Sequence, residues 1–216
     1  MTAELAYAYG AANRLEDAER LFGEIKQLGG LDEQEHPLNC ATMLGKQAEV
    51  YFRLRRFEEA ESLERRALHI RERIFPADQE TVLKTKSNLA STLNALGRHA
   101  DAEPLCRDVL AGRQKHAAEG GVAVARIAWA QRNLATVLSL QGKLDEALPL
   151  LAEALEGSLA VGMADMATDL KTSIEKVVQE LMKRRSGGET VVVVGSGAGT
   201  GDGGKHAQDD GYPGGF

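Results

Sequence analysis

Small and apolar residues return along the chain in the same order at a nearly fixed interval. One alanine recurs at Ala18, Ala60, Ala102 and Ala147, so successive copies are 42, 42 and 45 residues apart. A second alanine precedes each of these by twelve residues, and a leucine follows each by three. A repeat of about 20 to 50 residues is typical of stacked repeat proteins. The sequence therefore predicts an array of similar structural units.

The spacing within each copy predicts helices. Ala60, Leu63, Ala67 and Leu68 form one apolar stripe of a helix, with intervals of 3, 7 and 8 residues from the first. Acidic residues come early in this segment and basic residues late, which is the order that the helix dipole favours. The predicted helices include residues 2–12, 57–72, 80–96, 122–140, 144–160 and 164–185, with another starting near Leu15.

Each copy also predicts a tight turn between its two helices. Asn13, Arg55, Gly97 and Gly142 occupy the matching positions. Glycine and asparagine tolerate the left-handed backbone that follows many helix ends. Three of the four positions therefore carry suitable residues, and Arg55 is the exception.

The composition changes abruptly at Ser186. The final 31 residues contain 11 glycines and little apolar material outside the valines at 191–194. We expect two parts: a repeat array at 1–185, closed by residues 164–185 as a capping helix, and a flexible, disordered tail at 186–216.

The tail contains VVVVGSGAGTG, which is similar to the start of a dinucleotide-binding unit. That fingerprint needs a third glycine where Thr200 stands, followed by a helix and a second strand. Only 16 residues follow Thr200. We therefore expect no cofactor, and a blank result in a flavin or nicotinamide binding test.

Charge and composition narrow the function classes. The net charge of −6 argues against nucleic acid as the main partner. No apolar run reaches the roughly 20 residues needed to cross a bilayer, and the first residues lack the pattern of a secretory signal. Cys40 and Cys106 form no pattern and are expected to be reduced. The sequence predicts a soluble, cytoplasmic protein.

Two helices joined by a tight turn, with alanines where they cross, resemble the tetratricopeptide repeat. The common unit has about 34 residues, and the longer unit here is similar to the kinesin-light-chain type. Residues 75–78 match that family's entry segment, Asn88–Ala90 the first helix, Gly97 the turn, and Ala102 with Glu103 an AE pair. The resemblance covers about residues 3–160. It implies an all-α, right-handed superhelical solenoid of antiparallel helix pairs, with about four repeats of 42–45 residues.

The resemblance also implies a concave groove lined by the first helix of each repeat. An asparagine in that helix would bond the backbone of a bound peptide, and Asn88 and Asn133 hold the position here. Lys46 replaces it in the second repeat and, with Lys84 and Arg126, would favour an acidic peptide segment. The alternative is that all five are merely solvated polar positions. Trp129 is interpreted as a packing residue rather than a ligand anchor.

No pattern indicates catalysis or metal binding. His36 and Cys40 are four residues apart, but two ligands do not make a metal site. No serine, cysteine or carboxylate pair lies in a context that suggests a nucleophile with its base. We expect no enzyme activity.

Two functions remain open. The first is a non-enzymatic scaffold that binds a peptide segment of a partner protein, with neither nucleic acid nor membrane as a partner. The second is a sensor or regulatory part of a larger protein, because the array opens within a first unit and no heptad coiled coil precedes it. An exposed N-terminal repeat would also permit self-association.

Overall fold

The computed structural model describes residues 2–12, 14–27, 33–116 and 121–188. The secondary structure in these ranges is entirely α-helical, as predicted. Nine helices are described: α1 (Thr2–Ala11), α2 (Leu15–Gln27), α3 (Pro37–Arg53), α4 (Phe57–Ile74), α5 (Glu80–Ala95), α6 (His99–Lys115), α7 (Gly121–Leu140), α8 (Leu144–Ala160) and α9 (Ala164–Gly188).

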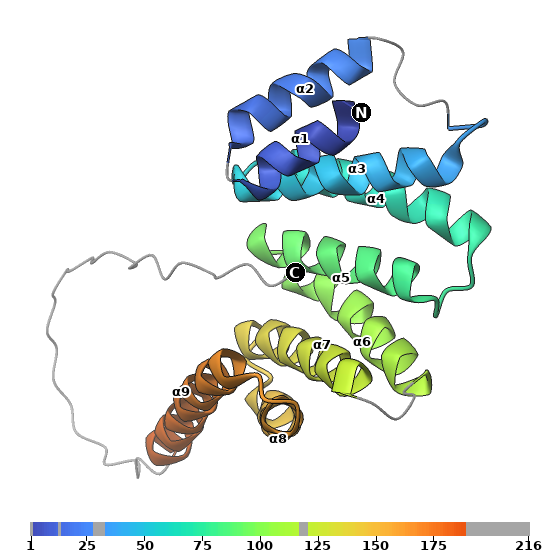
Figure 1. Cartoon of the computed structure of the whole chain (residues 1–216). Helices are drawn as coiled ribbons and strands as arrows, with labels where there is room; N and C mark the ends of the chain where they lie inside the picture. Colours follow the sequence, from blue (N-terminus) through green and yellow to red (C-terminus); the bar gives the residue numbers. More distant parts are fainter. Residues whose placement is uncertain (1, 13, 28–32, 117–120, 189–216) are drawn as a thin grey trace, which may run out of the picture.

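Consecutive helices pack as pairs, and the pairs stack in chain order. Figure 1 shows α1 with α2, α3 with α4, α5 with α6, and α7 with α8, followed by α9 against α8. The first helix of each pair is therefore α1, α3, α5 or α7. This arrangement confirms the predicted all-α repeat array.

The turns inside the pairs share one backbone geometry. Arg55, Gly97 and Gly142 have φ angles of 60°, 74° and 77°. The Arg56 N–H donates to the Tyr51 carbonyl, and the Arg55 N–H donates to the Phe52 carbonyl, which is the hydrogen-bond pattern of a Schellman motif. Arg55 therefore adopts the glycine conformation despite its side chain. Asn13, the fourth predicted turn residue, lies outside the described residues.

Small residues allow the helices of the array to approach closely. The four repeating alanines, Ala18, Ala60, Ala102 and Ala147, are all 0% exposed. Gly112 of α6 faces α5 so closely that a Cβ there would lie 2.7 Å from Leu83 Cδ2. A larger residue at such a position would push two helices apart.

The hydrophobic side chains form separate clusters along the array. The largest cluster runs from Leu68 of α4 to Val177 of α9 and includes Val82, Leu89, Ala90 and Leu93 of α5. Buried side chains of α3 belong to two other clusters, one with Val50 and one with Leu44. Among the described residues, no cluster contains buried side chains of both α3 and α5.

Helix α9 closes the described part of the array. Met166, Leu170 and Val177 are buried against the largest cluster. The helix ends at Gly188, three residues after the predicted end at 185. The valine and glycine segment of the predicted tail lies outside the described residues. Of the helices in the described ranges, none combines the length and apolar character required to span a membrane.

Candidate peptide-binding face

The first helices α5 and α7 run side by side in the same direction. Near their beginnings, Arg126 Nε lies 3.8 Å from Glu80 Oε1. Farther along, Asn133 Nδ2 donates to Ser87 Oγ at 3.4 Å. Both contacts join residues 46 positions apart, so the two helices are parallel and keep one register. Equivalent positions of neighbouring repeats are thus brought next to one another.

The two predicted asparagines occupy neighbouring places in this register. Asn133 lies beside Ser87, the residue that precedes Asn88. Both asparagine side chains are half-buried, and Lys84 and Ser91, one turn on either side of Asn88, are exposed. The 3.4 Å contact of Asn133 is long for a hydrogen bond and is therefore weak. The two asparagines therefore occupy neighbouring positions of adjacent repeats.

The charges of two predicted lysines, one on α3 and one on α5, act on the carboxylate of Glu49 in α3. Burial raises the pKa of Glu49, and the charges of Arg53, Lys84 and Lys46 partly oppose that rise. Glu49 also forms an ion pair with Arg53, at 3.5 Å. Lys46 and Lys84 therefore act on the same group, although they come from different repeats. We call the stripe made by Lys46, Glu49, Lys84, Asn88 and Asn133 the first-helix face.

Arg126 lies in the first turns of α7. Its nearest acid is Glu80, which also accepts a hydrogen bond from Arg113 Nη2 at 3.2 Å. A cavity of about 400 Å³ opens beside these residues. Its rim carries Asp78, whose pKa is lowered to about 2 by hydrogen bonds from Lys115 and His116. The charges around Arg126 are therefore mixed.

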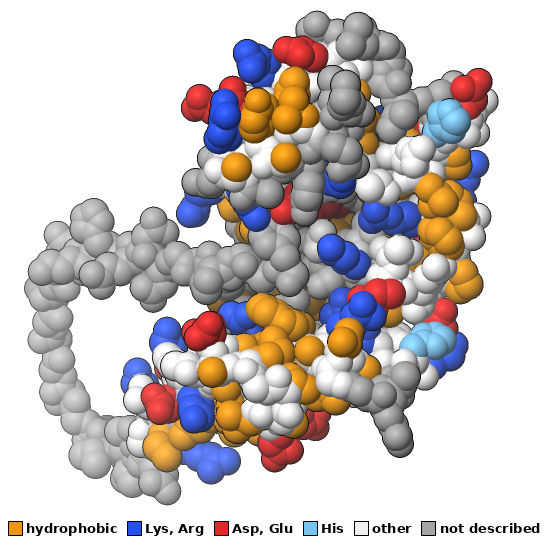
Figure 2. Space-filling view, viewed as in Figure 1, with side chains coloured by type: hydrophobic (Ala, Val, Ile, Leu, Met, Phe, Trp, Pro, Cys, Tyr) orange, Lys and Arg blue, Asp and Glu red, His pale blue; other side chains and the backbone are white. Residues whose placement is uncertain are grey.

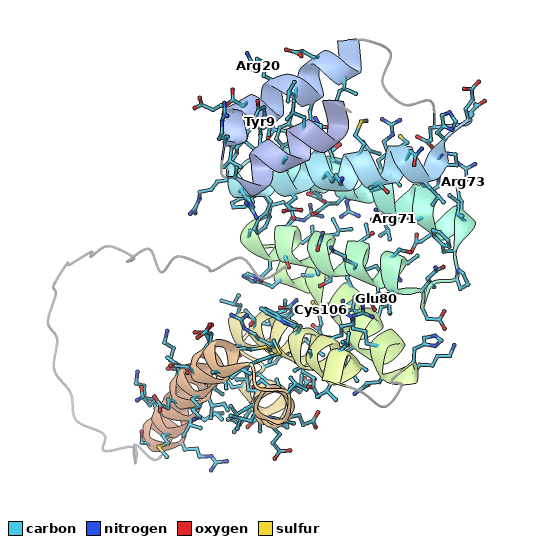
Figure 3. All side chains as sticks on the ribbon, viewed as in Figure 1. Tyr9, Arg20, Arg71, Arg73, Glu80 and Cys106 are labelled. Carbon is cyan, nitrogen blue, oxygen red and sulfur yellow. The ribbon has the colours of Figure 1, made fainter. Side chains whose placement is uncertain are left out.

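Arg71 is a residue of this region that sequence reasoning missed. Its guanidinium, carried by α4, donates to the Thr85 hydroxyl of α5 and lies 3.5 Å from the Ala41 carbonyl of α3. Figure 3 labels it between α3 and α5, where Figure 2 shows Lys and Arg side chains gathered. The sequence offers no signal for it, because Arg65, Arg66 and Arg73 of the same helix fit the helix dipole equally well.

The side chain of Trp129 packs against neighbouring hydrophobic residues. Its side chain is half-buried against the largest hydrophobic cluster, and the Arg132 guanidinium lies 5.1 Å from the centre of its ring. This placement agrees with its interpretation as a packing residue.

Reactive groups are scarce in the described ranges. No cluster of three or more His, Cys, Asp or Glu side chains there could hold a metal ion. Cys40 and Cys106 are both buried and form no disulfide bond. Burial raises the pKa of Cys106 to about 12, with a smaller contribution from Glu103, so this thiol is protonated at neutral pH.

Comparison with solved structures finds the same fold. The putative kinesin light chain repeats of P. anserina are 19% identical, with a TM-score of 0.61 over 88% of this chain and 96% of that one. A Rap protein complexed with Competence and Sporulation Factor is 16% identical, with a TM-score of 0.65 over 87% of this chain and 51% of that one. YrrB, described as a tetratricopeptide repeat protein with an unusual peptide-binding site, is 17% identical, with a TM-score of 0.53 over 84% of this chain and 90% of that one. At these identities the likeness establishes the fold alone.

Sequence comparison identifies the family. No curated protein sequence matches the chain. A family model for the tetratricopeptide repeat matches residues 39–115 and 81–160, which together cover more than half of the chain, from the first turn of α3 to the end of α8. The repeating alanines, the left-handed turns and the stacked helix pairs agree with that match. The chain belongs to the tetratricopeptide repeat family.

Proposed function

We propose that this chain is a non-enzymatic scaffold that holds an extended peptide segment of a partner protein on the first-helix face. Repeats of this family generally serve protein–protein interaction. The observation that carries the proposal is the placement of Asn88 and Asn133 at neighbouring positions of two parallel helices. YrrB, with the same fold, has a peptide-binding site.

The chemistry of an amide suits this task. A carboxamide accepts through its oxygen and donates through its nitrogen, so it can bond both groups of a peptide unit. The weak contact between Asn133 and Ser87 can be exchanged for a bond to a ligand at little cost. Two such amides on adjacent repeats would hold the backbone of an extended peptide without contacting its side chains, so they would not select a particular sequence.

Lys46 and Lys84 would add a preference for acidic segments. Both act on Glu49, so their side chains lie at the α3–α5 end of the face. Arg126 would contribute less, because Glu80 already offsets its charge. The proposed segment therefore has its acidic part toward α3 and α5.

A titration tests the role of the amides. The probe is a fluorescein-labelled decapeptide selected from a random library for binding to the whole chain. Replacing Asn88 and Asn133 together by Ala should weaken its binding by more than tenfold, measured by fluorescence anisotropy. A matched control replaces Gln114 and Gln179, exposed amides on α6 and α9, by Ala and should leave the affinity unchanged. Equal affinity of the two double variants would refute binding through these asparagines.

A further inference from the structure

Arg71 is a half-buried cation without an acidic partner among the described residues. Its guanidinium contacts only neutral oxygens there, those of Thr85 and Ala41. Burial lowers its pKa, and no carboxylate opposes that effect. A charge removed from water is costly unless an opposite charge compensates it. Two neutral oxygens satisfy part of the hydrogen-bonding capacity of a guanidinium, but they supply no negative charge.

Other partly buried arginines of the array differ from Arg71 in this respect. Arg53 pairs with Glu49 at 3.5 Å, Arg113 with Glu80 at 3.2 Å, and Arg132 with Asp169 at 3.7 Å. Each therefore has a carboxylate from the chain itself. Arg71 is partly buried like these three arginines, but it has no such carboxylate among the described residues.

The residue of α3 that faces the Arg71 guanidinium is a glycine and carries no side chain. Gly45 of α3 lies so close that a Cβ there would be 3.8 Å from Nη2 and 3.9 Å from Nη1. That distance is ordinary contact, so a longer side chain at 45 would cover the cation. The residue after Gly45 is Lys46, and the residue before Thr85 is Lys84. The Arg71 guanidinium therefore contacts residues that are adjacent in sequence to the two lysines of the first-helix face.

We propose that Arg71 is the specificity-determining residue of this face and binds a carboxylate of the partner's peptide segment, with Lys46 and Lys84 beside it. This inference rests on the proposed function. A guanidinium has five N–H donors in one plane and binds a carboxylate through two parallel hydrogen bonds. With one donor directed to Thr85 and another to the Ala41 carbonyl, three remain for a bidentate contact. The partner is therefore a protein with a Glu, an Asp or a terminal carboxylate at one fixed position of the bound segment.

Two peptides that differ in a single carboxylate measure how much that carboxylate contributes to binding. The probes are the selected decapeptide and its counterpart in which the acidic residue nearest the α3–α5 end is changed to the corresponding amide. On the wild-type chain the amide peptide should bind about tenfold more weakly. On Arg71→Gln most of this difference should disappear, with only the weaker preference due to Lys46 and Lys84 left. The control is Arg73→Gln, because Arg73 is exposed on the same helix two residues away, and it should preserve the tenfold difference.

The outcomes separate this inference from the proposed function. If Arg71→Gln keeps the tenfold difference, or if selection yields peptides without acidic residues, Arg71 is not the anchor, while the amide mechanism stands on its own double variant. If the library yields no binding peptide at all, both the proposed function and the role of Arg71 are refuted. Should Arg71→Gln fail to fold, the Arg71 Nε–Hε resonance of the wild-type chain, assigned with Arg71→Lys, gives the answer. It must shift with the acidic peptide and not with the amide peptide.

Discussion

The guanidinium of Arg98 lies 2.8 Å from the carboxylate of Glu61, which belongs to the preceding repeat. The same contact recurs along the array between Lys143 and Glu103, at 2.7 Å, and between Arg56 and Glu19. In every case the cation lies four residues before a repeating alanine, and the carboxylate lies one residue after the preceding one. These pairs form an ion-pair ladder that links the second helices of neighbouring repeats.

The ladder predicts a loss of stability in acid. The hydrogen bond from Lys143, reinforced by Arg107, lowers the pKa of Glu103 to about 2 from an ordinary value of 4.5. Because the pKa of Glu103 is lowered in the folded state, the ionised carboxylate adds to the stability of the fold. This stabilisation is complete above pH 4.5 and disappears as the pH falls toward 2. Lys143→Met should therefore lower the melting temperature at pH 7 by a few degrees at most, corresponding to about 1 kcal/mol or less. At pH 2 the variant and the wild type should melt alike, and a difference that persisted there would contradict the assignment.

The turn at Arg55 predicts a stabilising substitution. A residue with a Cβ costs about 1 kcal/mol in the left-handed region, and glycine avoids that cost. Arg55→Gly should raise the free energy of unfolding by up to about 1 kcal/mol, less the weak contact of its guanidinium with the Phe57 ring at 5.9 Å. Denaturant titration measures the change.

The reciprocal variant serves as its control. Gly97 has the same turn geometry and open space around the position of its missing Cβ. Gly97→Ala should therefore cost about 1 kcal/mol through backbone conformation alone. Changes of the same sign in the two variants would show that the turn geometry does not govern their stability.

The buried side chain of Glu64 should make the stability of the fold depend on pH in the opposite direction to Glu103. This side chain is 4% exposed at the contact of α4 with α5, next to Thr92, and burial raises its pKa to about 8. The folded chain then holds a proton that the unfolded chain releases near pH 4.5. Stability should fall as the pH rises from about 4.5 to 8 and level off above that range. Glu64→Gln should remove this decline and melt a few degrees higher at pH 9. Parallel melting curves for variant and wild type between pH 5 and 9 would show that Glu64 is ionised in the fold.

Replacing two helical glycines by alanine should change the stability of the fold in opposite directions, because only one of them lies at the close approach of α5 and α6. At Gly112 an added methyl group would collide with Leu83, at 2.7 Å, so Gly112→Ala should destabilise by about 1 to 3 kcal/mol, reduced by the better helix propensity of alanine. At Gly23 of α2 no atom lies within 4 Å of an added Cβ. Gly23→Ala should therefore stabilise by up to about 1 kcal/mol. Thermal unfolding of both variants checks the pair, and a stabilised Gly112→Ala would exclude the close contact.

The repeating alanines explain why the fold could be predicted from the sequence. Ala102 and its equivalents must be small wherever two helices cross, so this constraint recurs once per repeat and is visible as a period. The turn glycines recur for a similar reason. Arg55 was predicted as an exception because its residue type disfavours the geometry, yet neighbouring helix packing imposes the same turn.

The candidate site could be predicted only in part, because it depends on contacts between repeats. The asparagines could be placed from their repeat position. The environment of Arg71 is set by Thr85 on one neighbouring helix and Ala41 on another, which the sequence of α4 does not encode. The pairing of Arg126 with Glu80 of α5 is likewise a contact between repeats.

The ion-pair ladder has a consequence for how arrays of this kind change in length. Each inner repeat presents a carboxylate to the repeat that follows and a cation to the one that precedes, at fixed positions relative to its alanine. A duplicated 42-residue unit, inserted after residue 121, would therefore meet an opposite charge at both new junctions. Whole repeats can therefore be gained or lost while the electrostatic match between neighbours is preserved.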